Sequence, residues 1–244
     1  MYRAPRREID LSGTADDALV ERADAAFGET APGEGIVLAA DGDLAPICLA
    51  FLARRREQFA WDPLEFGPPA WRAEVHHRAG STPETIAEAL GRDHERLAAL
   101  LTRIVEAARG PDRAAARPAF ARFDLGWTRH VRVEEDLLFP AYDYRARLRY
   151  GPLTQVLRDQ HGLCARVVGR MRDALAATRN GDPAVAEALI HLVSDLRLTL
   201  DAHHEKEETS FLPACDEILA PEKRFQILTE MKLWKPGPRA EEER

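Results

Sequence analysis

The feature that most constrains the fold is a motif that the chain contains twice. Residues 130–140 read HVRVEEDLLFP and residues 203–213 read HHEKEETSFLP. When the two are aligned on their prolines, His130 matches His203 and Glu134 matches Glu207. A histidine and a glutamate four residues apart lie on one face of a helix, so their side chains reach a common point beside it. Two such helices can direct two imidazoles and two carboxylates to a shared centre.

Two further helical stretches each carry one histidine that we expect to face the interior. They are RDHERLAALL, with His94, and RDQHGLCARV, with His161. The leucines that follow His94 at helical spacing indicate that its face is turned to the core. The spacing from His94 to His130 is 36 residues, and that from His161 to His203 is 42. The region therefore consists of two helix pairs of matching design.

Other residues in or near the motifs are not expected to be ligands. His204 lies about 100° round the helix from His203 and is expected to face elsewhere. Glu135 and Glu208 are expected to accept hydrogen bonds or to remain solvated. Trp127 is expected in the core, although it shares the face of the cluster. The remaining histidines have no partner at ligand spacing and are expected to be structural or on the surface: His76, His77 and His191.

Four imidazoles and two carboxylates in an apolar bundle are costly to desolvate unless cations compensate the charge. One copy of the motif alone is typical of a surface ion pair, but two copies with matching histidines favour a metal site. The motif has neither the HExxH order of zinc proteases nor the Glu-x-x-His order of ferritin-like proteins. Mixed imidazole and carboxylate ligation suits iron better than magnesium or calcium, and six ligands are too many for one structural zinc. We predict a non-haem di-iron centre among His94, His130, Glu134, His161, His203 and Glu207.

The combination of DHERL, HVRVEEDLLFP, DQHGL and HHEKEETSFLP resembles the hemerythrin-like (HHE) domains over roughly residues 85 to 218. The resemblance implies that Glu134 and Glu207 bridge two iron ions, with an oxo or hydroxo bridge, and that the four histidines are terminal ligands. Oxygen-carrying hemerythrins have one more histidine, at the position of Ala165 in this chain. Its absence implies an open position on both metals, which permits bridging ligands, pairs of nitric oxide molecules or iron release.

The predicted function is the binding of dioxygen or nitric oxide for sensing, storage or stress response. The ligand set is also similar to that of di-iron proteins associated with repair of damaged iron centres, but those carry an N-terminal domain with adjacent cysteines, which this chain lacks. A di-iron oxidoreductase or repair protein is the alternative, and a metal-free interaction scaffold is a third. No acid–base residue outside the ligands is placed to serve catalysis, which favours a binding protein over an enzyme.

From residue 81 onward the apolar period is helical throughout. A first helix is predicted to begin at STPE, with Ser81 as N-cap and Glu84 as its capping-box partner, and to end at Gly110. Further helices are predicted over about residues 113–147 and 153–179, and from Pro183 with Asp182 as cap. Four long helices with short turns are typical of an all-α, up-down-up-down four-helix bundle.

The first 79 residues change character about every ten positions. Strands are predicted at 7–12, at 35–40 and on both sides of the turn Gly67-Pro68-Pro69, with helices at 16–27 and at 43–56, the latter capped by Asp43. The order βαβαββ predicts a two-layer α+β domain. The predicted domains are residues 1–79, residues 80–220, and residues 221–244 as a short helix with the flexible tail PGPRAEEER.

The N-terminal segment resembles small domains of unknown function with a TusA-like, sulfur-carrier fold. APGEGIVL, DGDLAPICLAFL and FAWDPLEFGPPAWRAEV carry this resemblance. Sulfur carriers of that fold place a Cys-Pro pair at a helix start, whereas this chain has Ala45-Pro46, with Cys48 two residues later. The difference argues against persulfide transfer.

Composition excludes several classes of partner. The net charge is −7, and arginine-rich stretches are balanced by acids nearby, so nucleic acid is not an expected partner. The first residues lack the apolar run of a signal peptide, and no segment has the roughly 18 to 20 apolar residues of a membrane span, so a cytoplasmic protein without membrane contact is predicted. The three cysteines form no CxxC and are expected in the core: Cys48, Cys164 and Cys215.

Overall fold

The computed structural model describes residues 7–67, 70–80, 82–146, 153–176 and 182–236. They form two compact units: the residues up to Glu84 together with 228–236, and Thr85–Ile227. The domain limits predicted from the sequence, at residues 79 and 220, stay predictions. Every helix in the described part of the chain is too short or too polar to cross a membrane.

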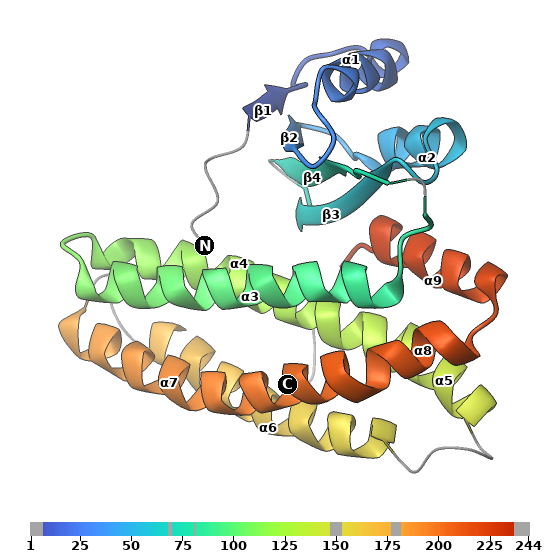
Figure 1. The fold of residues 1–244 in the computed structure, drawn as a ribbon. Helices are drawn as coiled ribbons and strands as arrows, with labels where there is room; N and C mark the ends of the chain where they lie inside the picture. The colour runs from blue at the N-terminus through green and yellow to red at the C-terminus, as the bar shows by residue number, and fades with distance from the viewer. Residues whose placement is uncertain (1–6, 68–69, 81, 147–152, 177–181, 237–244) are drawn as a thin grey trace. The chain divides into compact units, whose positions relative to one another are not determined.

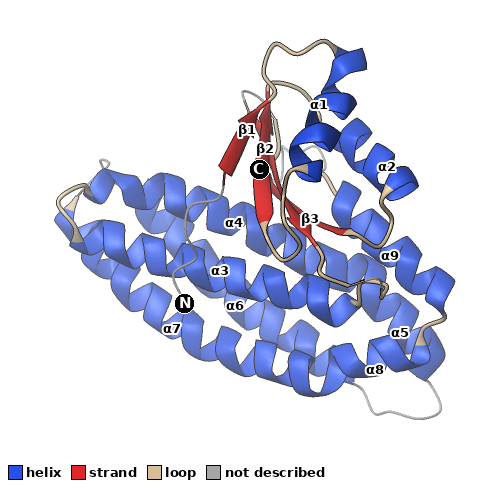
Figure 2. Ribbon diagram, turned by 45° about the horizontal axis from the view of Figure 1, so that its top comes forward, coloured by secondary structure: helices blue, strands red, loops and turns tan. Residues whose placement is uncertain are grey.

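The first unit is a four-stranded sheet with two helices, in the predicted order βαβαββ (Figures 1 and 2). The sheet order is β1-β2-β4-β3, with β1 parallel to β2 and the other pairs antiparallel. Aromatic rings of the helices and strands pack edge to face in its core. The elements are β1 (Arg7–Asp10), α1 (Asp16–Gly28), β2 (Gly35–Ala40), α2 (Ala45–Arg54), β3 (Phe59–Glu65) and β4 (Trp71–His77).

The start of α2 differs slightly from the prediction. Leu44, not Asp43, is its N-cap residue, although the Asp43 carboxylate accepts a hydrogen bond from the Ala45 N–H at 2.9 Å. Cys48 is fully buried on this helix, and burial raises the pKa of its thiol to about 12. A thiol that stays protonated is a poor nucleophile. The TusA-like resemblance stays a prediction, and Cys48 does not supply the reactive thiolate of a sulfur carrier.

Residues near the C-terminus complete the first unit. The helix α9 (Pro221–Leu233) begins in the second unit, and from Leu228 onward it belongs to the first. The Lys232 ammonium pairs with the Glu84 carboxylate, and both side chains are nearly buried. The Trp234 ring packs edge to face on Phe66, with centroids 5.3 Å apart. The predicted flexible tail PGPRAEEER lies, after its first residue, outside the described residues.

The second unit is the predicted four-helix bundle, whose successive rods run in opposite directions (Figure 1). Asp182 caps the fourth rod by accepting a hydrogen bond from the Ala184 N–H at 2.8 Å, as predicted. The rods are α3 (Ile86–Arg109); η1 (Arg113–Ala115), α4 (Ala116–Arg132), η2 (Val133–Leu138) and α5 (Phe139–Ala146); α6 (Leu153–Ala176); and α7 (Pro183–Lys206), η3 (Glu207–Phe211) and α8 (Leu212–Ile218).

The predicted capping box of Ser81 and Glu84 is wrong. The helix α3 begins four residues later, with Thr85 as N-cap and Glu88 as its reciprocal partner, while Ser81 lies outside the described residues. The sequence contains two consecutive boxes, STPE at residues 81–84 and TIAE at residues 85–88. The proline inside the first box disfavours helical backbone in the residue before it, so the second box starts the helix.

The glutamates of both motifs lie in π-helical segments, η2 and η3, and not in the regular α-helix that the sequence spacing assumed. Each segment ends two residues before a proline, Pro140 or Pro213. A proline has no N–H, and its ring crowds the carbonyl four residues earlier, so the α-helical ladder is interrupted there and a wider turn takes its place. In a wider turn, consecutive side chains are separated by a smaller angle around the helix axis. Glu134 and Glu135 can therefore both reach the cluster.

The two helix pairs exchange contacts at their ends. The Asp216 carboxylate, near the end of the fourth rod, accepts hydrogen bonds from the Ile86 and Ala87 N–H groups at 3.1 and 3.2 Å, at the start of α3. The matching residue of the second rod, Asp143, accepts a hydrogen bond from the Thr154 hydroxyl at the start of α6, at 2.8 Å. Each pair thus supplies an aspartate to the first helix of the other pair.

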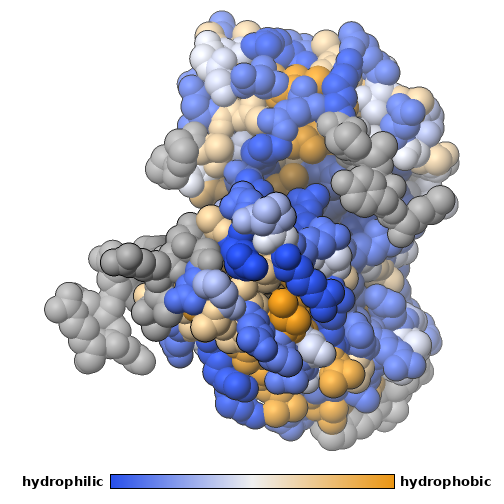
Figure 3. Space-filling view, turned by 90° about the vertical axis from the view of Figure 1, so that its left-hand side faces the viewer, coloured by the Kyte–Doolittle hydropathy of each residue, from blue (hydrophilic) through white to orange (hydrophobic). Residues whose placement is uncertain are grey.

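A few large apolar residues are exposed in the described part of the chain. On the face seen in Figure 3 hydrophilic residues predominate, and hydrophobic ones occur in small groups. Scattered exposed apolar residues are normal for a folded protein. The large ones are spread over both units: Leu49, Tyr144, Val156, Leu163, Leu198 and Phe225.

Replacing Asp216 by alanine should destabilise the bundle, because two backbone N–H groups at the start of α3 lose their acceptor. We expect the free energy of unfolding in urea to fall by about 1–2 kcal/mol, the range measured for lost helix caps. Glu217→Ala, at the exposed neighbouring position, is the matched control and should change little. Equal losses in both variants would contradict the role of Asp216.

Candidate metal centre

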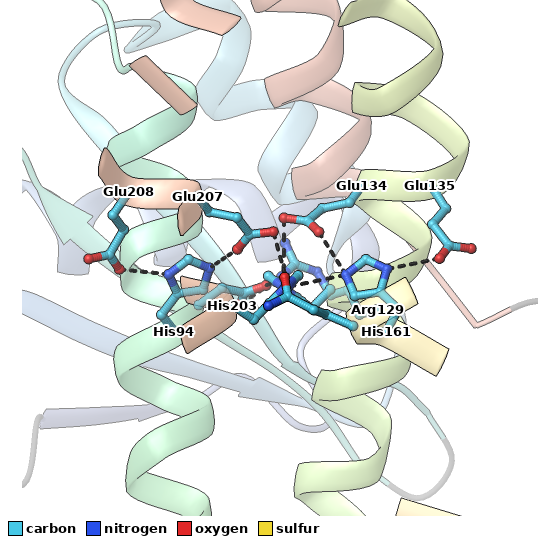
Figure 4. A network of polar contacts seen from close by, with 11 residues as sticks. His94, Arg129, Glu134, Glu135, His161, His203, Glu207 and Glu208 are labelled. Atoms are coloured by element: carbon cyan, nitrogen blue, oxygen red, sulfur yellow. Dashed lines mark hydrogen bonds and ion pairs between the residues drawn. The ribbon is translucent and has the colours of Figure 1, made fainter. Parts of the chain in front are cut away.

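The six side chains predicted as ligands come together inside the bundle, each from the rod predicted for it. Figure 4 shows five of them converging from different helices. The four imidazoles and two carboxylates are buried, with exposed fractions of 4% or less: His94, His130, Glu134, His161, His203 and Glu207. Their role as metal ligands stays a prediction.

The Glu134 carboxylate spans two histidines from different rods. Its Oε1 lies 3.7 Å from the Nε2 of His130 on its own rod. Its Oε2 lies 3.1 Å from the Nε2 of His161 on α6. The two oxygens therefore point to different imidazoles.

The Glu207 carboxylate repeats this geometry in the other helix pair. Its Oε1 lies 3.0 Å from the Nε2 of His203, and its Oε2 lies 3.2 Å from the Nε2 of His94. The histidines form two pairs by ring distance, with His94 5.2 Å from His130 and His161 4.7 Å from His203. Each carboxylate therefore directs one oxygen to each histidine pair.

The second glutamate of each motif holds a histidine from outside. The Glu208 Oε1 lies 2.7 Å from the Nδ1 of His94, and the Glu135 Oε1 lies 2.8 Å from the Nδ1 of His161 (Figure 4). A carboxylate at Nδ1 accepts the ring proton and leaves Nε2 directed to the cluster. Of the two alternatives predicted for Glu135 and Glu208, the hydrogen bond is the one observed.

The other two histidines face polar residues that the sequence reasoning missed. The Nδ1 of His203 lies 3.4 Å from Gln160 Oε1, and the Nδ1 of His130 lies 3.9 Å from Asp93 Oδ2. The Asp93 carboxylate accepts hydrogen bonds from the buried Arg129 guanidinium at 2.8 and 2.9 Å. Asp93 and Gln160 directly precede the histidines of α3 and α6. These matching positions could have indicated that both residues lie beside the cluster.

Several buried atoms of the cluster make no hydrogen bond of good geometry among the described residues, although carboxylates and imidazoles face one another at 3.0–3.7 Å. They are both ring nitrogens of His130, the Nε2 atoms of His94 and His204, and both carboxylate oxygens of Glu134 and Glu207. Buried polar groups are ordinarily paired, and each unpaired group costs free energy. Divalent cations placed among these lone pairs satisfy them and compensate the two carboxylates. The donor set therefore fits bound metal.

Burial is the main influence on the pKa values of the clustered side chains. Burial, with the Glu207 carboxylate nearby, raises the pKa of Glu134 to about 7. Burial lowers the pKa of His203 to about 4 and takes the pKa of His130 well below its ordinary value, with neighbouring imidazoles adding to the effect at His130. Burial opposes protonation of His94 and His161 as well, but their carboxylate partners raise the pKa of both rings. His130 and His203 are therefore neutral, as metal ligation requires.

The expectation that His204 faces elsewhere is wrong. Its ring stacks on that of His94, with centroids 3.8 Å apart and an interplanar angle of 6°. The buried side of a helix is at least about 100° wide, so a residue beside His203 can still face the neighbouring rod α3. Burial, with the charges of nearby imidazoles, lowers the pKa of His204 to about 2. Nitrogen and oxygen atoms of His204, His94, His130 and Glu207 lie within 4.8 Å of one another.

The remaining residues singled out in the sequence have structural roles. Trp127 is buried in the bundle core, as predicted, with its ring 5.8 Å from that of His130. His77 is hydrogen-bonded through Nδ1 to the Thr30 carbonyl at 2.6 Å. His191 is exposed on α7. The three cysteines are buried and form no disulfide: Cys48, Cys164 and Cys215.

His76 has partners that its sequence spacing did not reveal. Its Nε2 lies 3.3 Å from Asp62 and 3.5 Å from Glu74, on the sheet of the first unit. Asp62 is opposite Glu74 in the register of β3 and β4, so cross-strand pairing brings the group together. These contacts make His76 a buried structural residue, one of the two roles predicted.

The fold and the cluster define a class of protein: a four-helix bundle whose buried histidine and glutamate side chains can hold metal cations. The family model for the hemerythrin HHE cation binding domain matches residues 85–215. This match covers more than half of the chain, and the chain belongs to that family. No curated protein and no solved structure matches it significantly.

The pKa of Glu134 predicts how the metal-free protein responds to pH. Between the ordinary pKa of 4.5 and the folded pKa of about 7 the folded state retains a proton that the unfolded state loses, so the wild type loses stability as pH rises. Glu134→Gln lacks this loss. Its stability relative to the wild type should therefore rise by about 3 kcal/mol from pH 4.5 to 7.5, measured by urea unfolding with a chelator. A difference independent of pH would contradict the assignment.

Proposed function

We propose that the bundle binds two iron ions and uses them to bind dioxygen or nitric oxide. His94 and His130 would hold one metal, and His161 and His203 would hold the other. The observation that supports this most directly is the geometry of Glu134 and Glu207, since each carboxylate has one oxygen toward each histidine pair. That arrangement suits carboxylates that bridge two metals.

The donor set favours iron over other common cations. Magnesium and calcium prefer shells made of oxygen, whereas imidazole with carboxylate suits iron. The hydrogen bonds of Glu135 and Glu208 to Nδ1 atoms are the outer contacts that fix ring orientation and raise the basicity of metal-binding histidines. Membership of the HHE cation binding family agrees with this proposal.

A small ligand follows from burial and from the number of protein donors. The cluster is enclosed by the bundle, which favours ligands of two or three atoms. Two bridging carboxylates with two histidines per metal leave coordination positions open on both ions. Ala165, one turn after His161, is exposed and offers no donor. Glu135 and Glu208, the acidic residues beside the cluster, are engaged by imidazoles, which favours binding and sensing over turnover.

Metal loading tests the first part of the proposal. Anaerobic addition of ferrous iron to the metal-free protein should give two ions per chain by elemental analysis. Glu207→Ala should weaken iron binding at least about tenfold, because one bridging carboxylate is lost. The exposed neighbour variant Glu205→Ala is the control and should load normally. A wild-type protein that takes up no metal would leave only a structural bundle.

Gas binding tests the second part. The visible spectrum of the iron-loaded protein should change on addition of nitric oxide or dioxygen and return when the gas is removed. Continuous consumption of nitric oxide with product release would instead identify a di-iron oxidoreductase. Transfer of iron to a damaged cluster would identify a repair protein. An unchanged spectrum in fully loaded protein would reject gas binding.

A further inference from the structure

We propose that His204 is a fifth imidazole ligand, on the metal held by His94 and His130, and that it makes the two metal positions unequal. This inference rests on the proposed two-metal site and assigns it one more residue. The family match and the repeated motif do not point to His204, because the first motif has Val131 at the matching position.

The ring of His204 lies beside the rings of the cluster. Its ring lies parallel to His94 at 3.8 Å and edge to face with His130 at 5.8 Å. Nitrogen atoms of the three rings and an oxygen of Glu207 lie within 4.8 Å of one another. These four side chains form one possible ligand group. A larger possible group shares two of its residues and consists of His130, Glu134, His161, His203 and Glu207.

The ring nitrogen also lacks any other role in the described part of the chain. The Nε2 of His204 is buried and has no hydrogen-bond partner among the described residues. Stacking alone needs only an apolar ring, and a buried nitrogen without a partner is unfavourable. A cation shared with His94 and His130 gives this lone pair a partner.

The approximate symmetry of the bundle shows that the extra imidazole is on one side only. Val131, the match of His204 in the second rod, packs against the hydrophobic core of the bundle. The residues that face the Nδ1 atoms also differ between the two halves. His130 faces the Asp93 carboxylate, whereas His203 faces the neutral Gln160. The two halves share a ligand pattern but not a ligand number.

Unequal ligand numbers predict unequal affinities. The position with His94, His130 and His204 should fill first, and the position with His161 and His203 should fill second and retain more open coordination. Small ligands are then expected at the second metal. His204 thus separates a tightly held ion from an ion that binds the ligand.

Cobalt(II) titration of the metal-free protein tests this, because the visible absorption of cobalt reports its coordination. The absorption of the wild type should rise in two binding steps, one for each metal position. In His204→Ala and His204→Gln the first step should weaken about tenfold or more, and its absorption should change. The control is His191→Ala, which removes an exposed histidine from the same helix and should match the wild type. Free imidazole added to His204→Ala should restore the first step.

The outcomes separate the two proposals. If His204→Ala keeps the affinity and absorption of the wild type while Glu207→Ala loses metal, then His204 is not a ligand and the two-metal site stands. If the wild type binds no cobalt or iron, both proposals fail. Circular dichroism of each variant should show unchanged helix content, and a weakened first step without imidazole rescue would assign His204 to packing and overturn the inference.

Discussion

The bundle is organised around the burial of carboxylates and imidazoles at one point. Removing Glu134 and Glu207 from water is unfavourable by itself. The surrounding histidines compensate this cost only in part, because several ring nitrogens and carboxylate oxygens make no hydrogen bond of good geometry among the described residues. A cation site resolves this conflict. The same requirement explains why the cluster is enclosed by four rods and supported from outside by Glu135, Glu208 and Asp93.

The contacts between the helix pairs are reciprocal. The fourth rod supplies Glu207 and Glu208 to His94, and the second rod supplies their counterparts to His161. The aspartates near the rod ends are exchanged in the same way, since each accepts a hydrogen bond from the start of α3 or α6 in the other pair. Neither pair can therefore complete its own cluster, and the site forms only when the two pairs associate.

Much of this arrangement was readable from the sequence, for definite reasons. Spacing of four placed His130 with Glu134, and the apolar period of α3 placed His94 toward the core. The direction of His204 was not readable, because it depends on which rod lies beside α7. The group of His76 with Asp62 and Glu74 required the strand register, and the helix start at Thr85 required a choice between two consecutive boxes. The π-helical segments are signalled in the sequence by Pro140 and Pro213, which interrupt the α-helical hydrogen bonds.

The first unit is built from separated parts of the chain, with Lys232 and Trp234 packed on residues that precede α3. During synthesis, the sheet and its two helices emerge first, but the partners of Glu84 and Phe66 emerge only after the whole bundle has been made. The first unit is translated before the bundle but acquires its last native contacts after it, and the bundle can assemble while the first unit is still incomplete.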